Sequence, residues 1–394
     1  MKVLFSIIPG HGHFFPYLPL ARALVADGHE VVFATSDMYG ETIREYGFDA
    51  IGVGIDYTQG SVEFEDGNAE PVEKIMFVDN PPRVLADLLD YLPDSGVDVL
   101  LSDPTENGGM VAAEASGISW GGVVPGRRGG FYPGFVPFED SDRPDSDYFG
   151  AYQTMRSLRS AAGLEPREYL FGEFPYDRTF SLCMAPESFN GWPLPAQHHT
   201  SHPLRPEVHR SDSDDQWLEG LPDDLPVVSI SFGTLFGSPE LYSDAAQAAL
   251  ETGARVVVSS SYEIDVEDDR LTKVKWVSMD RLLERSDVFV HHAGWGSTVA
   301  ALATGTPSIV VPIGADQFAN AQGFKNTGAG ARVARDQVGS DLADALASVL
   351  KDDVYRLNAE RVQAEIEAMP SARDVIPLIE RLATDGVVLN KPQT

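Results

Sequence analysis

Histidine, glycine and hydroxyl side chains lie close together in the segment HHAGWGST, residues 291–298. An apolar run precedes the segment and an Ala/Leu-rich run follows it, so the pattern predicts a strand that ends where a helix begins. The first turn of a helix offers unpaired backbone N–H groups and the positive end of the helix dipole. Gly294 and Gly296 would let a ligand approach that backbone, while Ser297 and Thr298 add hydroxyl donors. This combination favours an anion site, most naturally for phosphate, although simple capping of the helix by Ser297 would also explain the residues.

A second loop of this kind ends the strand pattern SISFGT, residues 229–234, and contains Ser231, Gly233 and Thr234. A third, PGHGHFFP, lies near the N-terminus at residues 9–16. Neither loop has the spacing of the ATP-binding P-loop or of the dinucleotide fingerprint. Binding of ATP or of a dinucleotide in the usual way therefore finds no support.

His13, in the N-terminal loop, is a candidate general base, because a neutral imidazole can take a proton near neutral pH. Such a base needs a carboxylate to fix its tautomer, and Asp103 stands at the end of another predicted strand in the same half. A loop histidine without a catalytic role is the alternative.

The elements that must position these residues alternate between strand and helix. In the N-terminal half, buried strands are predicted at 3–8, 30–36, 97–104 and 118–126. A helix is predicted at 14–28, with one buried face made of Leu18, Ala21, Leu24 and Val25. The C-terminal half repeats the alternation, with strands predicted at 226–234, 254–260, 288–292 and 307–312. This order predicts two Rossmann-like halves, each a parallel sheet with helices on its faces.

A change of composition separates the two halves. Pro, His, Asp and Ser are enriched from about residue 193 to 226, which indicates an interdomain linker, set at 201–222. The predicted domains are accordingly 1–200 and 223–372, followed by a C-terminal segment, 373–394.

The chain is strongly acidic. It has 394 residues, with 29 Lys and Arg against 60 Asp and Glu, and a formal net charge of −31. This charge argues against nucleic acid and anionic membranes as partners, and no apolar run approaches the ~20 residues of a membrane helix. The single cysteine, Cys183, allows no internal disulfide and fits a cytoplasmic protein. The apolar N-terminus is interpreted as a first strand rather than a signal peptide.

The segments GHGHFFPYLPLARALVADGHEV and HHAGWGSTVAALATGTPSIVVPIGADQFANA closely resemble the nucleotide-sugar-dependent glycosyltransferases of the GT-B fold. This family includes the UDP-glycosyltransferases, and the resemblance is strongest to its bacterial members that modify natural products. It covers the whole chain in order. It implies an α/β fold of two Rossmann-like domains whose parallel sheets face each other across a cleft. The first domain would bind the acceptor, the second the sugar nucleotide, and the C-terminal helices would pack back on the first.

The resemblance implies a role for each matching residue. His13 resembles the base that deprotonates the acceptor hydroxyl, and Asp103 the carboxylate that supports it. Contacts to the nucleobase are implied for Trp276, with the backbone of Val277 and Ser278. Contacts to the diphosphate are implied for Ser231, Thr234, His292, Gly294, Gly296, Ser297 and Thr298. Contacts to sugar hydroxyls are implied for Asp316 and Gln317.

Two positions depart from the family pattern. Many members have Asn where Gly296 stands, so one side-chain donor is missing. Many users of uridine nucleotides have Glu, which binds the ribose hydroxyls, where this chain has Ala300. We expect a thymidine diphosphate sugar, a deoxyhexose, because no carboxylate is present to meet the 2′-hydroxyl. The alternative is that Ala300 merely favours the helix, and that backbone or water binds the ribose.

The expected reaction is an inverting transfer to a hydrophobic small molecule, as in antibiotic biosynthesis, without a metal or other cofactor. Aromatic residues of the Gly- and Pro-rich segment 126–150 would line the acceptor pocket: Phe131, Tyr132, Phe135 and Phe138. The alternatives are a UDP-sugar-dependent transferase of the same fold, a nucleotide-sugar epimerase, and a noncatalytic transferase partner. The chain could also form a homodimer.

Three other patterns carry less weight. GISWG, residues 117–121, has the spacing of a hydrolase elbow, but Ser119 lies between a predicted helix and a following strand, the reverse of that motif. The Asp pairs 145/147 and 212/214 are interpreted as solvated acidic residues of polar loops. The histidines at 198, 199 and 202 lack the spacing of a zinc site.

Overall fold

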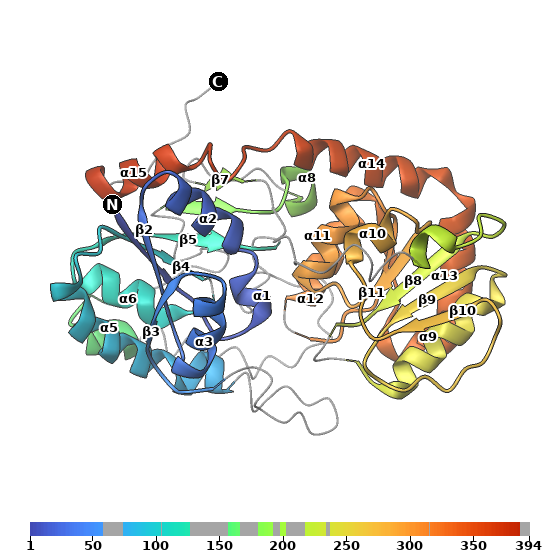
Figure 1. Cartoon of the computed structure of the whole chain (residues 1–394), viewed down its shortest axis with the longest axis horizontal. Helices are drawn as coiled ribbons and strands as arrows, with labels where there is room; N and C mark the ends of the chain where they lie inside the picture. Colours follow the sequence, from blue (N-terminus) through green and yellow to red (C-terminus); the bar gives the residue numbers. More distant parts are fainter. Residues whose placement is uncertain are drawn as a thin grey trace. The chain divides into compact units, whose positions relative to one another are not determined.

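The chain forms two compact units (Figure 1). Unit 1 contains Met1–Met184, Leu194–Pro206 and Pro370–Thr394, and unit 2 contains Ala185–Pro193 and Glu207–Met369. This computed structural model describes residues 1–57, 74–103, 105–126, 157–165, 180–191, 198–201, 217–233, 237–314 and 316–386. The stretch 185–193, which the sequence analysis places in the first domain, is therefore part of unit 2.

Unit 1 contains a seven-stranded parallel sheet in the order β3-β2-β1-β4-β5-β6-β7. Its strands are β1 (Lys2–Ser6), β2 (Glu30–Thr35), β3 (Asp49–Gly52), β4 (Val99–Ser102), β5 (Ser119–Val124), β6 (Phe180–Cys183) and β7 (His198–Thr200). The central strands are almost continuously apolar because helices cover both faces of a parallel sheet. Strand β7 falls within the predicted first domain, at the start of the Pro-, His-, Asp- and Ser-rich stretch. His199 is buried there and stacks on Phe180, with 5.3 Å between ring centroids.

The helices of unit 1 differ in one place from the predicted pattern. They are α1 (His11–Phe14), α2 (Leu18–Ala26), α3 (Asp37–Glu45), a π-helical turn (Ile75–Asp79), α5 (Pro81–Ser95), α6 (Asn107–Ala115) and α15 (Ile376–Asp385). The expected helix at 14–28 is thus split between α1 and α2. Leu18, Ala21 and Leu24 are buried as predicted, but Val25 is 50% exposed and Leu20 is buried instead. The prediction for Val25 was wrong because Leu20 completes the buried stripe with Leu24, four residues on.

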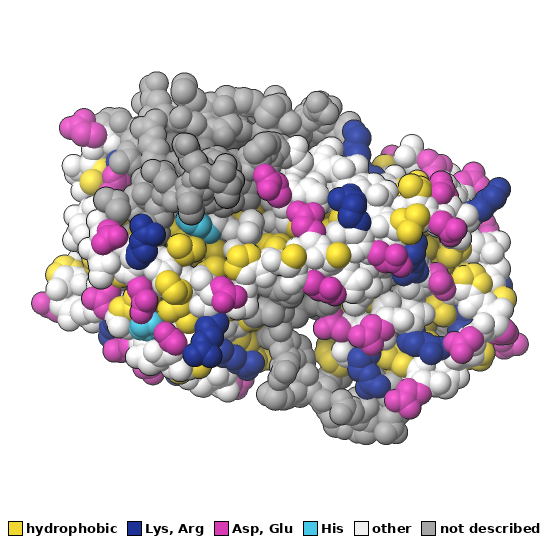
Figure 2. Space-filling view, turned by 90° about the horizontal axis from the view of Figure 1, so that it is seen from above, with side chains coloured by type: hydrophobic (Ala, Val, Ile, Leu, Met, Phe, Trp, Pro, Cys, Tyr) yellow, Lys and Arg dark blue, Asp and Glu magenta, His cyan; other side chains and the backbone are white. Residues whose placement is uncertain are grey.

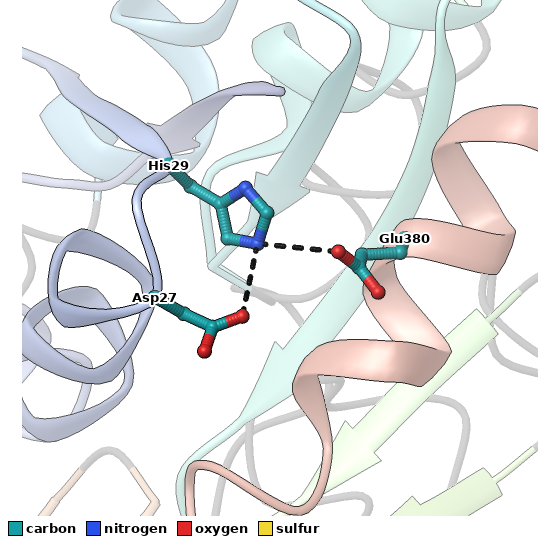
Figure 3. A group of neighbouring side chains, drawn as sticks. All are labelled: Asp27, His29 and Glu380. Carbon is teal, nitrogen blue, oxygen red and sulfur yellow. Dashed lines mark ion pairs between the residues drawn. The ribbon is translucent and has the colours of Figure 1, made fainter.

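Helix α15 packs on β5 and is anchored near the N-terminus by a histidine and two carboxylates (Figure 3). His29 Nε2 lies 3.4 Å from Glu380 Oε1 on α15 and 3.7 Å from Asp27 Oδ2. Its other nitrogen, Nδ1, lies 3.4 Å from the Met1 ammonium group, which can only donate. Nδ1 therefore accepts and Nε2 carries the proton. The Nε2–H group thus faces both carboxylates and brings the chain before β2 into contact with α15.

Unit 2 contains a six-stranded parallel sheet in the order β10-β9-β8-β11-β12-β13. Its strands are β8 (Val227–Ser231), β9 (Arg255–Ser259), β10 (Leu271–Val274), β11 (Val288–His291), β12 (Ser308–Val310) and β13 (Gly330–Arg332). Its helices are α8 (Glu187–Asn190), α9 (Pro239–Glu251), α10 (Met279–Leu283), α11 (Trp295–Ala303), α12 (Gln317–Thr327), the short 3₁₀ helix at Arg335–Gln337, α13 (Val338–Lys351) and α14 (Asp353–Glu367). Helices α9 and α13 pack together over one face of the sheet and share a hydrophobic core with its strands.

The short helix α8 explains why residues 185–193 belong to unit 2. Phe189 is fully buried against α11 and α12, with its ring 5.5 Å from Phe324 and 6.4 Å from Trp295. Its ring fills the space beside Gly323, where a Cβ would come within 2.3 Å of it. This contact is long-range packing, which no local pattern near residue 189 could reveal.

The surface is consistent with the acidic composition. Figure 2 shows Asp and Glu side chains spread over the described part of one face, with Lys and Arg between them. Within the described ranges, no helix combines the length and the apolar character needed to cross a membrane.

Candidate functional site

Each sheet has a point at which its strand order reverses. In unit 1, β1 lies beside β4, and successive strands run outward from this pair in opposite directions. In unit 2, the corresponding pair is β8 and β11. Ligands of open α/β sheets bind outside the carboxyl ends of the strands at such a point. His13, Asp103 and the expected diphosphate residues follow these four strands, whereas the expected nucleobase and sugar residues follow β10 and β12.

His13 and Asp103 meet at the reversal point of unit 1. His13 lies in α1, after β1, and Asp103 directly follows β4. His13 Nδ1 lies 2.8 Å from Asp103 Oδ2, with the His13 side chain 12% exposed and that of Asp103 fully buried. The contact joins residues 90 positions apart in sequence, as the sequence analysis expected. With Nδ1–H directed at the carboxylate, Nε2 is the nitrogen that can accept a proton.

Asp103 is held by donors on both of its oxygens. Tyr17 donates its hydroxyl to Oδ2 at 2.8 Å. Thr105 donates its backbone N–H to Oδ1 at 2.7 Å and its hydroxyl to the same oxygen. Burial alone would raise the pKa of Asp103, but the His13 ring and the Thr105 hydrogen bonds outweigh it, so the pKa lies below its ordinary value. Asp103 is therefore an ionised, fixed acceptor for His13.

A second buried carboxylate shapes the loop that carries Asp103. Glu106 caps α6 by accepting from the backbone N–H groups of Gly108 at 2.8 Å and Gly109 at 2.7 Å. Ser6, the last residue of β1, donates to Glu106 Oε2 at 2.6 Å. Burial raises the pKa of Glu106, although these hydrogen bonds oppose the rise. The sequence analysis missed Tyr17, Thr105 and Glu106; the Glu before an Asn-Gly-Gly helix start was the one local signal.

The β11–α11 loop of unit 2 begins with two neutral histidines. His291 is fully buried, and burial holds its pKa well below the ordinary value. His291 Nδ1 accepts from the backbone N–H of Ala293 at 3.1 Å. Ala293 has a φ of 65°, in the left-handed region that L-residues avoid, and among the described residues it is the non-glycine residue found there. The loop is thus a strained turn held by side chains.

His292 fixes the neighbouring loop after β8. A Cβ on Gly233 would lie 2.9 Å from the His292 ring, and a Cβ on Gly294 only 2.4 Å from its Nε2. Both glycines are therefore needed for the position of this ring. Burial lowers the pKa of His292 to about 4, although a backbone hydrogen bond with Ser231 opposes the shift. His292 is accordingly a neutral hydrogen-bonding group at physiological pH.

The N-terminus of α11 has the features of an anion site. Gly294 is the N-cap residue and has no side chain to bond the first-turn N–H groups. Ser297 lies inside the helix, so the alternative in which it caps the helix is wrong. Thr298 is fully buried, and its hydroxyl has no hydrogen-bond partner among the described residues. At Gly296 a Cβ would meet nothing within 4 Å, so the backbone there is open.

The expected sugar residues begin α12. Gln317 is buried, and its Oε1 accepts from the backbone N–H groups of Ile313 at 2.8 Å and Gly314 at 3.0 Å. Its amide oxygen therefore shapes the loop after β12. Asp316 Oδ2 accepts from Asn320 Nδ2 at 2.7 Å.

The expected nucleobase residues follow β10. Trp276 is 36% exposed, Val277 is buried, and Ser278 is the N-cap residue of α10. Ala300 is buried, with 1% exposure, in the second turn of α11. Position 300 thus presents no polar side chain.

Several sequence predictions lie outside the described residues. These are Thr234, Phe131, Tyr132, Phe135 and Phe138, and the Asp pairs 145/147 and 212/214. Ser119 opens strand β5, after α6, which confirms that GISWG is not a nucleophile elbow.

Comparisons with known proteins agree with this architecture. Residues 251–382 match a family model described as "Erythromycin biosynthesis protein CIII-like, C-terminal domain". Erythronolide mycarosyltransferase of Saccharopolyspora erythraea is 26% identical, with 97% of this chain and 99% of the relative covered. The 10-deoxymethynolide desosaminyltransferase of Streptomyces venezuelae is 24% identical, with 97% of each chain covered. The solved structure of glycosyltransferase VinC in complex with DTDP has a TM-score of 0.74 and 22% identity, covering 98% of this chain and all of that one.

The likeness to solved structures extends over nearly the whole chain and shows the fold, two parallel α/β sheets of the GT-B type. The sequence relatives match over the same extent. The comparisons and the fold together support a natural-product glycosyltransferase of the GT-B fold, an enzyme of the glycosyltransferase type.

Proposed function

We propose that this protein transfers a deoxyhexose from a thymidine diphosphate sugar to a hydroxyl group of a hydrophobic natural product, with inversion at the anomeric carbon. The observation that carries the proposal is the pair of His13 and Asp103, 2.8 Å apart at the carboxyl ends of β1 and β4. The open N-terminus of α11, at the carboxyl end of β11, supports the nucleotide part of it.

His13 would act as the general base. Its Nε2 takes the proton of the acceptor hydroxyl while the acceptor oxygen bonds to the anomeric carbon, and the bond from that carbon to the diphosphate breaks. The ionised Asp103 stabilises the imidazolium that forms. Assistance of this kind typically accelerates a reaction about 10²- to 10⁴-fold.

The leaving diphosphate would be met in unit 2. Backbone N–H groups at the start of α11, the hydroxyls of Ser297 and Thr298, and the positive end of the helix dipole offset its charge. His292 contributes as a neutral donor rather than as a cation, since its pKa is about 4. These groups supply the charge stabilisation that a metal ion would otherwise give, so the proposed reaction uses no metal and no other cofactor.

The donor base and sugar are inferred from two observations. Ala300 offers no polar atom where uridine-nucleotide users of the resembling family have Glu. The related VinC was solved with DTDP, and the related enzymes are named for the deoxysugars mycarose and desosamine. A site that buries the ribose 2′-hydroxyl without a partner disfavours uridine by about 1–3 kcal/mol, or roughly 5- to 150-fold.

Calorimetric titration tests the donor proposal with three nucleotides: thymidine, uridine and 2′-deoxyuridine diphosphate. The expected result is that the thymidine and 2′-deoxyuridine forms bind similarly and the uridine form binds at least fivefold more weakly. Equal or tighter binding of uridine diphosphate would favour a UDP-sugar-dependent transferase. If none of the three binds, the diphosphate site at α11 is wrong.

A second assay separates transfer from its alternatives. Incubation of the protein with thymidine diphosphate glucose alone should leave the sugar configuration unchanged, whereas an epimerase would convert it without an acceptor. A noncatalytic partner would bind the nucleotide but transfer nothing to any acceptor of a hydroxylated aromatic or macrolide panel. We also propose a cytoplasmic location, and light scattering would test whether the chain forms a homodimer.

A further inference from the structure

Asn320 connects two parts of the nucleotide-sugar site of unit 2. It is fully buried in the first turn of α12, and one side-chain amide nitrogen makes two contacts. Asn320 Nδ2 lies 2.7 Å from Asp316 Oδ2 and 2.9 Å from the backbone carbonyl oxygen of Ala293. The primary amide has two hydrogens on this nitrogen, so it can donate to both acceptors at once.

The two acceptors have different positions in the proposed site. Ala293 is the strained residue of the β11–α11 loop, directly before the open N-terminus of α11. Asp316 is the residue that would bind a sugar hydroxyl. Asn320 therefore reaches the diphosphate loop with one hydrogen and the sugar-binding carboxylate with the other.

Hydrogen bonds hold the strained turn at both the N–H group and the carbonyl group of Ala293. Its N–H donates to His291 Nδ1 at 3.1 Å, and its carbonyl accepts from Asn320. His291 also contacts α12, because its ring lies 5.5 Å from that of Phe324 in an edge-on arrangement. A left-handed conformation is unfavourable for an L-residue, and these two buried hydrogen bonds offset that strain.

We infer that Asn320 is a positioning residue for the donor: it orients the Asp316 carboxylate toward the sugar and sets its distance from the diphosphate loop. The inference rests on the proposed function, since it assigns Asp316 to the sugar. A glutamine or serine at 320 would place its donor at a different depth, so neither could make both contacts with the same geometry.

The experiment measures the affinities for thymidine diphosphate and for thymidine diphosphate glucose by calorimetry. The variants are Asn320→Ala, Asp316→Ala, the double variant, and Asn326→Ala as a control. Asn326 lies on the same helix, and its Nδ2 bonds the backbone of Phe189 at 3.2 Å. The control thus removes a structural asparagine contact of α12 without touching Asp316 or Ala293.

Asn320→Ala is expected to weaken binding of thymidine diphosphate glucose about tenfold more than binding of thymidine diphosphate, because Asp316 loses the donor that orients its carboxylate toward the sugar. In the Asp316→Ala background this extra loss should disappear. Asn326→Ala should lower the melting temperature without changing the ratio of the two affinities. Asn320→Asp, which is nearly isosteric, should bind the sugar nucleotide still more weakly, because a carboxylate cannot donate to Asp316 or to the Ala293 carbonyl.

Three outcomes would overturn parts of this picture separately. If Asn320→Ala weakens both ligands equally, or matches the control, Asn320 is only structural and the inference fails while the proposed function stands. If Asp316→Ala binds thymidine diphosphate glucose as tightly as the wild type does, Asp316 does not hold the sugar and the positioning role fails with it. If the wild-type protein binds neither ligand, the proposed function itself is wrong.

Discussion

Replacing Asp103 by Asn should stop catalysis by placing the proton of His13 on the wrong nitrogen. The backbone N–H of Thr105 donates to Oδ1 from a fixed position, so the new amide must keep its oxygen there. Its NH₂ group then takes the place of Oδ2 and faces His13 Nδ1. The hydroxyl of Tyr17 can turn to the carbonyl of Val123, 3.1 Å away, and so does not oppose this orientation. His13 Nδ1 must then accept, which moves the proton to Nε2.

The size of the effect follows from the loss of the base. With a proton on Nε2, His13 cannot take the acceptor proton, and the stabilising negative charge of Asp103 is gone as well. The contribution of a general base, about 10²- to 10⁴-fold, should be lost, which corresponds to roughly 3–5 kcal/mol of activation free energy. Hydrogen bonds to Thr105 persist, so the variant should remain folded.

The assay is the initial rate of transfer from thymidine diphosphate glucose to a hydroxylated acceptor that the wild type accepts. Nucleotide affinity is the internal control, because the proposed nucleotide residues belong to the other unit, and it should change less than about threefold. Asp94→Asn, an exposed carboxylate on α5 of the same unit, should keep full activity. An Asp103→Asn variant that retains more than a tenth of wild-type kcat/KM with intact binding would refute the tautomer reasoning.

Three further predictions concern the support of the two sites. Tyr17→Phe removes one donor from Asp103 while Thr105 still holds its other oxygen, so kcat/KM should fall by less than about tenfold; a loss as large as that of Asp103→Asn would contradict it. Gly294→Ala should weaken thymidine diphosphate at least tenfold, because its Cβ would displace the His292 ring, whereas Gly296→Ala, with open space at its Cβ, should bind within about threefold of the wild type. Since the pKa of His292 falls from 6.5 unfolded to about 4 folded, the unfolded state takes up its proton first, and the contribution of His292 to the free energy of unfolding should fall by no more than about 3 kcal/mol as the pH drops from 6.5 to 4. Urea unfolding across that range measures it, and His292→Gln should lose this part of the slope.

Much of the framework was predictable because it depends on local patterns. Short apolar runs ended by Gly, Pro or His predicted the central strands of both sheets. Each run is buried on both faces of its sheet, so apolar and polar residues do not alternate along it. This continuous apolar pattern differs from the 3.6-residue period of the helices. His13 and Asp103 were predicted to meet because His13 lies in the segment after one central strand and Asp103 directly follows another, and parallel strands bring their carboxyl ends to one edge.

Other parts depended on contacts between residues far apart. Tyr17 bonds Asp103 across 86 residues, and Phe189 packs into a space left by Gly323. The positive φ of Ala293 has no local signal either, because alanine gives no sign of a left-handed turn. The division of the chain at α8 was missed for the same reason, since four residues carry no periodicity.

The two sites show why strand order predicts a place for function but not its chemistry. At both reversal points the strands supply backbone N–H groups and the ends of loops, and these alone would suit many anions and many reactions. In unit 1 the chemistry comes from a buried carboxylate whose donors force one histidine tautomer. In unit 2 it comes from a neutral histidine, a strained alanine and an asparagine that connects them to an aspartate. Under the proposed function, specificity would rest on buried hydrogen bonds behind the contact residues, and substitutions there should alter ligand preference without exposing any new surface.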